Sequence, residues 1–417
     1  MEKINTLYLS LDGIMDPLGK SQILPYLRKL AGKGVVCVLL TLEKRENLQD
    51  RVYIVRLKDE LAYMGIQWKF LEYARRPYFI AKLRNFLAML LLSLKIAKEN
   101  NINFIHARSY VMSVCALILK KFYGMPFLFD MRGFWVDERV ESGTWRYGSV
   151  QYRIAKYLER VILENADEII SLTAVAADEI SGFYFMRRKR NDISVIPTCV
   201  DLERFAPGHS GPIALAEETK KLLENSFLVY SGSISTWCMP YEMLLFLQAI
   251  QKSFARISFL VLTQEKSLFE DILKKRGSND VSVRVLTVDY ENISGYLSLG
   301  MAGLAFYKPG FSRKARCPTK IGEYLACGLP VVINSGLGDT EEMIHKERVG
   351  VVLHEFSDPE YQRASRDLTD ILSEGNSLRN RCREAARKYF SLDEGVEKYM
   401  NVYTRLAGAT GSAGRTF

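Results

Sequence analysis

Residues 313–332 have the sequence RKARCPTKIGEYLACGLPVV, which joins a basic segment, a short helix and the start of an apolar strand. Pro318 suits the first turn of a helix, where its missing N–H costs nothing. Gly328 and Pro330 then end the helix and lead into a buried strand. This helix-to-strand unit belongs to a pattern that runs along the whole chain.

Apolar runs of strand length alternate with longer helical patterns on both sides of this segment. Strands that are apolar on both faces predict parallel sheets with helices on both sides. The predicted strands are Thr6–Ser10, Val35–Thr41, Phe104–His106, Phe127–Asp130, Glu168–Leu172 and Ile193–Ile196, and then Phe227–Ser231, Ile257–Leu262, Val281–Leu286, Gly303–Phe306, Pro330–Ile333 and Val349–Leu353.

The chain of 417 residues is too long for one ordinary core. The pattern pauses after Pro197 in a segment rich in proline and glycine, and then restarts. We therefore predict an α/β protein of two Rossmann-like, doubly wound domains that face a central cleft. The expected divisions are an N-terminal domain over 1–205, a C-terminal domain over 206–385, a helix over 386–406 that crosses back and breaks near 390–391, and a flexible tail over 407–417.

Composition narrows the class of protein further. The seven cysteines are scattered without a CxxC pair, which favours a reducing compartment, so we expect a cytoplasmic protein. The longest apolar stretch, residues 86–94, is shorter than the roughly 20 residues that span a bilayer. The net charge of +9 divides into +8 for residues 1–205 and +1 for residues 206–417. This asymmetry indicates an anionic partner, either phosphate groups or a membrane surface, or else a solvated basic face.

The helix after Pro318 carries the residues of a phosphate site. Thr319 and Lys320 fall at its N-terminus, where unpaired amides and the helix dipole favour an anion such as a diphosphate. Glu323 follows one turn later, where a carboxylate can accept hydrogen bonds from ribose hydroxyls. The alternative is an ordinary capped helix.

Three features of the chain resemble retaining GT-B glycosyltransferases of family 4. They are the run 318–332 with Glu323, the segment VIPTCVDLERF at residues 195–205, and the order of elements from Thr6 to Tyr403. The resemblance implies transfer of a sugar, with retention, from a UDP- or GDP-linked donor to an acceptor bound by the N-terminal domain. It implies no cofactor, and a glycolipid or polysaccharide intermediate as acceptor.

The same resemblance implies further donor-binding residues. Gly19 matches a glycine near the donor, and Gly232, Ser233 and Thr236 match a loop that faces phosphate. The chain departs from the family at Ser233, where an arginine is common, near Met239, where a lysine is common, and at Ala315, where another glutamate is common. Arg316, with Arg313, Lys314 and Lys320, can supply the missing positive charge.

The first domain offers polar candidates in residues 129–138, which follow a predicted strand. We predict catalytic roles for Arg132 and Asp130, in addition to Lys320. Arg132 can stabilise the leaving diphosphate or bind an anionic acceptor, or it can form a salt bridge with Asp130 or Glu138. His106 ends another strand and is expected to be a satisfied structural histidine.

We expect no metal, because the chain has no Asp-x-Asp motif and its cations can replace the ion. Nucleic acid is not an expected partner, since no signature of its recognition occurs. The basic and aromatic residues 75–86 and the tetrabasic run 187–190 suggest peripheral contact with the inner face of the cell membrane. A buried helix and a solvated loop are the alternatives for these segments.

Two other functions remain open for the same fold. A nucleotide-sugar 2-epimerase needs carboxylates and histidines around the sugar, and this chain has only four histidines. A non-catalytic relative that binds a nucleotide sugar or a partner enzyme fits the departures at Ser233 and Ala315.

Overall fold

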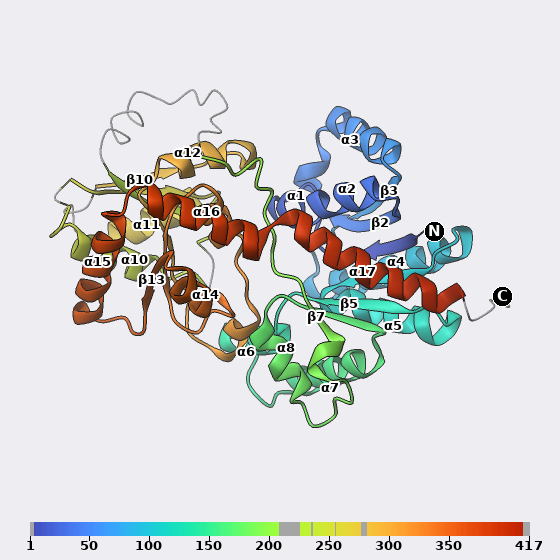
Figure 1. The fold of residues 1–417 in the computed structure, drawn as a ribbon. Coiled ribbons are helices and arrows are strands. Elements are labelled where there is room, and N and C mark those ends of the chain that lie inside the picture. The colour runs from blue at the N-terminus through green and yellow to red at the C-terminus, as the bar shows by residue number, and fades with distance from the viewer. Residues whose placement is uncertain (1–3, 208–225, 235–236, 255, 277–281, 412–417) are drawn as a thin grey trace. The chain divides into compact units, whose positions relative to one another are not determined.

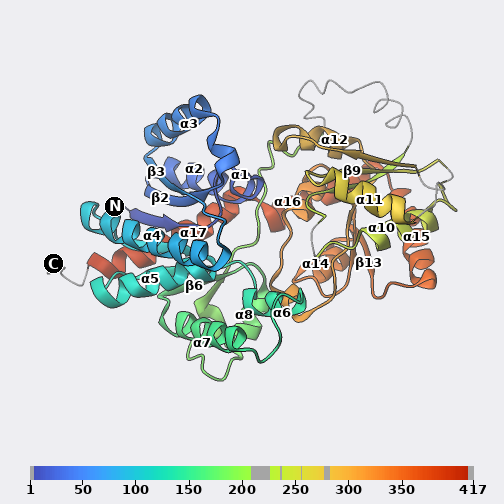
Figure 2. The same ribbon diagram turned by 180° about the vertical axis from the view of Figure 1, so that it is seen from behind.

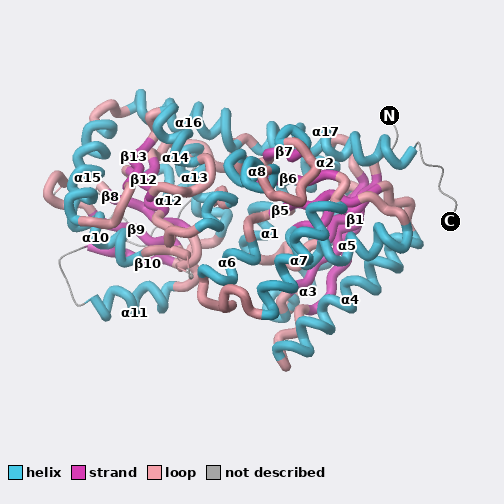
Figure 3. Tube along the Cα trace, turned by 90° about the horizontal axis from the view of Figure 1, so that it is seen from below, coloured by secondary structure: helices cyan, strands magenta, loops and turns pink. Residues whose placement is uncertain are grey.

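The computed structural model describes residues 4–207, 226–234, 237–254, 256–276 and 282–411 (Figure 1). The chain divides into two compact units: unit 1 comprises Met1–Pro197 and Leu392–Phe417, and unit 2 comprises Thr198–Ser391. In each unit, helices lie on both sides of a parallel sheet (Figure 3). The α/β class with two doubly wound sheets, predicted from the sequence, is therefore confirmed.

Unit 1 contains seven parallel strands in the order β3-β2-β1-β4-β5-β6-β7. The central strands β4 and β5 are buried along their whole length, because helices cover both faces of the sheet. Helix α17 lies in front of the sheet in Figure 1, and α4 and α5 lie in front in Figure 2, which shows the opposite side. The strands are β1 Asn5–Leu9, β2 Val36–Glu43, β3 Ile66–Glu72, β4 Phe104–Arg108, β5 Phe127–Met131, β6 Glu168–Ser171 and β7 Ile193–Val195. The helices are α1 Pro17–Gln22, α2 Leu24–Gly32, α3 Arg51–Tyr63, α4 Tyr78–Glu99, α5 Ser109–Tyr123, α6 Trp135–Glu141, α7 Val150–Asn165, α8 Ala174–Ser181 and α17 Leu392–Gly411.

Unit 2 contains six parallel strands in the order β10-β9-β8-β11-β12-β13. Strand β8 alternates its side chains between two apolar cores: Leu228 and Tyr230 pack with α10 and α15, whereas Phe227 and Val229 pack with α13 and α16. The strands are β8 Phe227–Ser231, β9 Ser258–Leu262, β10 Ser282–Leu286, β11 Ala302–Ala305, β12 Val331–Asn334 and β13 Gly350–Leu353. The helices are α10 Pro240–Ile250, α11 Lys266–Arg276, α12 Ile293–Leu299, α13 Thr319–Ala326, α14 Thr340–Glu347, α15 Asp358–Leu372 and α16 Asn376–Phe390.

Strand β3 was not predicted from the sequence. Its residues IQWKFLE alternate between apolar and polar, and the strand pairs only with β2 at the edge of the sheet. An edge strand is half exposed, so it lacks the continuous apolar run by which the other strands were found.

The C-terminal helices follow the sequence pattern with two differences in extent. Helix α16 ends at Phe390 and α17 begins at Leu392, so the predicted break lies at Ser391. Helix α17 continues to Gly411, beyond the helix end predicted at 406, because Leu406 and Ala407 are buried in unit 1. The boundaries between the two units lie after Pro197 and after Ser391. The domain boundaries predicted from the sequence were after residues 205 and 385.

Candidate functional site

Helix α13 sits where the strand order of unit 2 reverses, between β8 and β11. The Ser231 amide at the end of β8 donates to the Tyr324 hydroxyl at 2.8 Å, and that hydroxyl donates to the Leu304 carbonyl in β11 at 3.4 Å. Ligands of doubly wound sheets bind at the carboxyl ends of the strands at such a switch point. Tyr324 therefore fixes α13 at the expected place for a ligand site.

The helix begins one residue later than its sequence suggested. Pro318 is the N-cap with extended backbone, not a residue of the first turn, and Thr319 is the first helical residue. Within the part of the chain that the structure describes, no side-chain hydrogen bond caps this N-terminus. Gly328, with φ of 79°, ends the helix as predicted before β12 begins at Val331.

Lys320 lies between the loop after β8 and two aromatic rings. Its ammonium is 3.7 Å from the centre of the Tyr230 ring and 5.7 Å from that of Tyr307. A Cβ on Gly232, whose φ is 127°, would lie 2.9 Å from the ammonium nitrogen. Only glycine allows this backbone and this approach together. Burial lowers the pKa of Lys320 to about 8, although Cys238 and Glu323 oppose the shift.

Glu323 is 5% exposed on the same helix. Burial raises the pKa of its carboxyl to about 7, while Lys320, a hydrogen bond with Tyr290 and the charge of Arg204 act in the other direction. The guanidinium of Arg204 stacks 4.5 Å from the centre of the Tyr290 ring. A raised carboxyl pKa beside a lowered lysine pKa is typical of functional sites.

The loop after β8 shows how the other predicted donor-binding residues are held. Ser233 is exposed, and its hydroxyl donates to Glu265 Oε2 at 2.7 Å. The Tyr230 hydroxyl donates to the Ser233 carbonyl at 2.5 Å. Thr236 lies outside the described residues.

Two arginines before α13 flank one indole ring. The guanidinium carbons of Arg313 and Arg316 lie 4.1 Å and 5.1 Å from the centre of the Trp237 ring. Arg313 is 2% exposed, whereas Arg316 is half-buried. Ala315, at the position where the family often has glutamate, is 2% exposed. The segment therefore brings positive charge, but no second carboxylate, close to the start of α13.

In unit 1, the structure brings Asp130 and Arg132 together after β5. The Arg132 guanidinium lies 3.4 Å from Asp130, which is fully buried. Asp130 also accepts from the Tyr399 hydroxyl on α17 at 3.3 Å, and Arg108 lies 3.6 Å away. Burial alone would raise the pKa of Asp130, but the charges of Arg132 and Arg108 and the hydrogen bond from His106 hold it well below its usual range.

His106 has the structural role expected from its sequence position. It is 1% exposed, and its ring nitrogens contact the Tyr403 hydroxyl at 2.7 Å and Asp130 at 3.3 Å. Burial lowers its pKa despite Asp130, so the ring is neutral at physiological pH.

Gly19 has a packing role that the sequence does not reveal. A Cβ there would lie 2.2 Å from the Gly13 carbonyl oxygen and 2.5 Å from Ile14 Cα. The loop before α1 therefore packs directly against Gly19. A contact between Gly19 and the donor remains a prediction.

Lys320 and Glu323 were predicted from the sequence, but the residues that surround them were not. The missed residues are Arg204, Tyr230, Tyr290, Trp237, Tyr307 and Tyr324 in unit 2, and Gln22, Arg108, Tyr399 and Tyr403 in unit 1, where the Gln22 amide oxygen accepts from both Arg108 and Arg132. Arg204 lies in the segment 195–205 that carries the resemblance, but its place beside Tyr290, like the contacts of the other residues, follows only from the fold.

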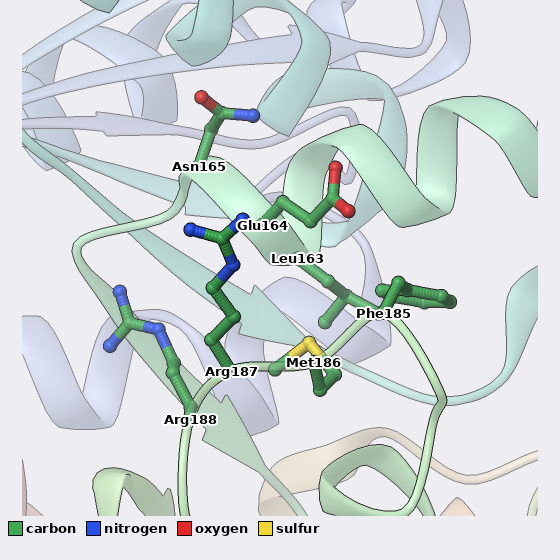
Figure 4. A pocket seen from close by; sticks show the side chains of 7 residues that line it. All are labelled: Leu163, Glu164, Asn165, Phe185, Met186, Arg187 and Arg188. Atoms are coloured by element: carbon green, nitrogen blue, oxygen red, sulfur yellow. The ribbon is translucent and has the colours of Figure 1, made fainter.

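The tetrabasic run proposed for membrane contact is partly held by contacts within unit 1. In the run 187–190, Arg188 donates to the Ala166 carbonyl and Arg190 pairs with Asp178 at 2.5 Å. A pocket of about 280 Å³ separates this loop from the end of α7, toward which the Arg187 side chain extends (Figure 4). Within the described residues, no helix is long and apolar enough to cross a membrane.

The two doubly wound units share the GT-B fold of solved glycosyltransferase structures. Residues 23–204 match the family described as Glycosyltransferase Family 4. This match covers less than half of the chain and agrees with the resemblance of its motifs to that family. No curated protein matches it in sequence.

Solved structures share the fold over nearly the whole chain. Sucrose-phosphate synthase from Thermosynechococcus elongatus has a TM-score of 0.71 at 16% identity, over 97% of this chain and 100% of that chain. HepE from Anabaena in complex with UDP and glucose has a TM-score of 0.68 at 13% identity, over 96% and 100%. WaaG, a glycosyltransferase involved in lipopolysaccharide biosynthesis, has a TM-score of 0.66 at 14% identity, over 96% and 100%.

Proposed function

We propose that this enzyme moves a sugar from a UDP- or GDP-linked donor to a glycan or lipid-linked acceptor, with retention and without a metal. The observation that carries the proposal is the placement of Lys320 and Glu323 on α13 at the β8–β11 switch point. HepE, which shares the fold, is described in complexes with UDP, with UDP and glucose, and with UDP-glucose, and this supports a nucleotide-sugar donor.

Lys320 is proposed to face the donor diphosphate, together with the amides at the start of α13. The bond between the anomeric carbon and the diphosphate breaks, and its electron pair stays on the diphosphate. Negative charge therefore grows next to the lysine in the transition state, where a preorganised cation stabilises it most. The acceptor oxygen bonds to the anomeric carbon on the same face, and its proton passes to a phosphate oxygen of the donor.

Glu323 is proposed to accept hydrogen bonds from the ribose hydroxyls. A carboxyl whose pKa lies near 7 is partly protonated before donor binds. Hydrogen bonds from the ribose favour its charged form. Donor binding and ionisation of Glu323 are thereby coupled.

In unit 1 we propose that Arg132 binds an anionic group of the acceptor or the leaving diphosphate. Asp130 is fully buried, so it acts by positioning Arg132 and does not itself contact substrate. We therefore propose a positioning role for Asp130 in place of the direct catalytic role predicted from the sequence.

The proposal also covers the acceptor and the cellular location. The description of WaaG and the basic unit 1 support a lipid-linked glycan as acceptor. All seven cysteines are described and none forms a disulfide, which supports a cytoplasmic location, with peripheral contact at the inner face of the membrane.

A panel of UDP-, GDP- and ADP-sugars tests the function. We expect one donor to bind and to be transferred or slowly hydrolysed with release of the nucleotide, equally well in excess chelator. Interconversion of the donor sugar without nucleotide release would indicate the epimerase instead. Binding of a donor without turnover in the presence of membrane lipid extracts would indicate a non-catalytic relative.

A further inference from the structure

We propose that the outer face of α4 docks unit 1 on an anionic lipid bilayer; this rests on the lipid-linked acceptor of the proposed function. Ile80, Leu83, Leu87 and Leu91 are 65%, 59%, 45% and 66% exposed. Their spacing of three, four and four residues places all four on one face of the helix. A contiguous row of large apolar side chains on a surface marks an interaction site.

This apolar row is not needed for the fold of unit 1. The opposite face of α4 carries the buried residues Ala81, Met89 and Ile96, and the helix packs through that side against β1 and β2. The helix is therefore apolar on two sides, one of which is occupied by the sheet. The outer row is exposed, so it lies outside the core of unit 1.

The charges beside the apolar row indicate an anionic partner. By helical spacing, Arg84, Lys95 and Lys98 fall on the same outer face. Glu99 is the only acidic residue of α4, and it lies 3.7 Å from Lys95. Exposed leucines flanked by cations are the composition of helices that lie in the interface of an anionic bilayer. A protein partner or a second copy of this chain would need an acidic counterpart to these cations.

A second helix of the same layer, α7, carries a similar exposed row. Helix α5 packs against both α4 and α7, so the three helices lie side by side on one face of the sheet (Figure 2). On α7, Val150, Ile154 and Tyr157 are 70%, 55% and 66% exposed. Their spacing of four and three residues again forms a single row.

The chain direction places this surface near the expected acceptor site. Helix α4 follows β3, so its first turns lie at the carboxyl edge of the sheet, where Arg132 also lies. In the chain, α6 and then α7 connect β5 to β6. A bilayer in contact with these first turns would present lipid headgroups close to that edge.

Binding of the full-length protein to vesicles tests the proposal. Wild type should bind vesicles of phosphatidylcholine mixed with phosphatidylglycerol, and bind much more weakly to phosphatidylcholine alone. Arg84→Gln with Lys98→Gln should lower the affinity about 25-fold, because each cation near an anionic surface contributes about fivefold. Leu83→Gln with Leu87→Gln should lower it by about tenfold or more, because these side chains no longer insert.

The matched control is Val52→Gln with Val55→Gln on α3, where the side chains are 81% and 58% exposed. This variant should bind the vesicles as wild type does. Donor affinity without vesicles should stay unchanged in all three variants, so a failure of docking can be told apart from a failure of the proposed function. Wild-type vesicle binding by the leucine variant would overturn the proposal. So would a wild-type dimer in sedimentation that the leucine variant loses, because the row would then join two copies of the chain.

Discussion

The ammonium nitrogen of Lys320 lies 3.7 Å from the centre of the Tyr230 ring. A cation over an aromatic face is attracted to the ring even where water is largely excluded. The ring thus holds the lysine beside the loop after β8, although burial disfavours its charge. This arrangement prepares a positive charge for an anion that is not yet bound.

Replacement of Gly232 by alanine tests this close approach. The added Cβ would lie 2.9 Å from Lys320 Nζ and would force a side chain to adopt φ of 127°. We expect Gly232→Ala to lose about 1–3 kcal/mol of stability and to weaken donor binding. Gly34→Ala is the control, because Gly34 has φ of 88° but open space around it. Calorimetry should show weaker donor binding only in Gly232→Ala; equal donor affinity in both variants would contradict the arrangement.

The pH dependence of donor affinity tests the role of Lys320. Its pKa of about 8 means that the free protein loses the positive charge as the pH rises through 8. A diphosphate favours the charged form, so binding should take up a proton and weaken above pH 8. Titrations on both sides of pH 8, in buffers of different ionisation enthalpy, measure both effects. A Lys320→Met variant should show neither proton uptake nor weakening in this window.

Glu323 makes a separate contribution to stability. Its carboxyl pKa is raised from 4.5 to about 7 in the folded protein. The folded state therefore binds more protons than the unfolded state between these values, and the associated stability is lost as the pH rises from 4.5 through 7. Relative to Glu323→Gln, wild type should lose free energy of unfolding over this range. Parallel denaturation curves for the two proteins at every pH would show that the carboxyl pKa is not raised.

Asp130 should be essential for the stability of unit 1. Asp130→Asn leaves Arg108 and Arg132 without their buried counter-charge, which should cost about 3–5 kcal/mol in denaturant unfolding. Asp12→Asn removes a carboxylate that also lies near Arg108 but is 45% exposed, and it should cost about 0–1 kcal/mol. Because the folded pKa of Asp130 is lowered from 3.8, this stability is present above pH 3.8 and disappears as the pH falls through the folded value. A similar loss of unfolding free energy in the two variants would contradict a special stabilising role of the buried carboxylate of Asp130.

The fold could be predicted from the sequence because most strands are buried on both faces. All twelve predicted strands exist, and β3 was missed because its exposed edge gives it an alternating pattern. The break at Ser391 was also predictable from the interruption of the helical pattern. The end of α17 was not, because burial of Ala407 is a tertiary effect.

Candidate site residues could be predicted from the sequence only where they lie close together in the chain. Lys320 and Glu323 share one helical turn, and their spacing shows it. The contacts of Lys320 with Tyr230, and of Glu323 with Tyr290, join segments that are distant in sequence. The hydrophobic pattern of the sequence does not predict such a contact, because the contact depends on the order of the strands in the sheet.

The most direct test of the account compares Lys320→Met and Glu323→Gln for donor affinity, turnover and melting temperature. Glu323→Gln should weaken donor binding by about 1–3 kcal/mol, the contribution of a charged hydrogen bond. Lys320→Met should lower turnover more than donor affinity, because the diphosphate gains charge in the transition state. Lys346→Met, an exposed lysine on α14, is the control and should resemble wild type. Changed melting temperatures with wild-type affinity and turnover in both site variants would contradict the account, because α13 would then be a plain structural helix.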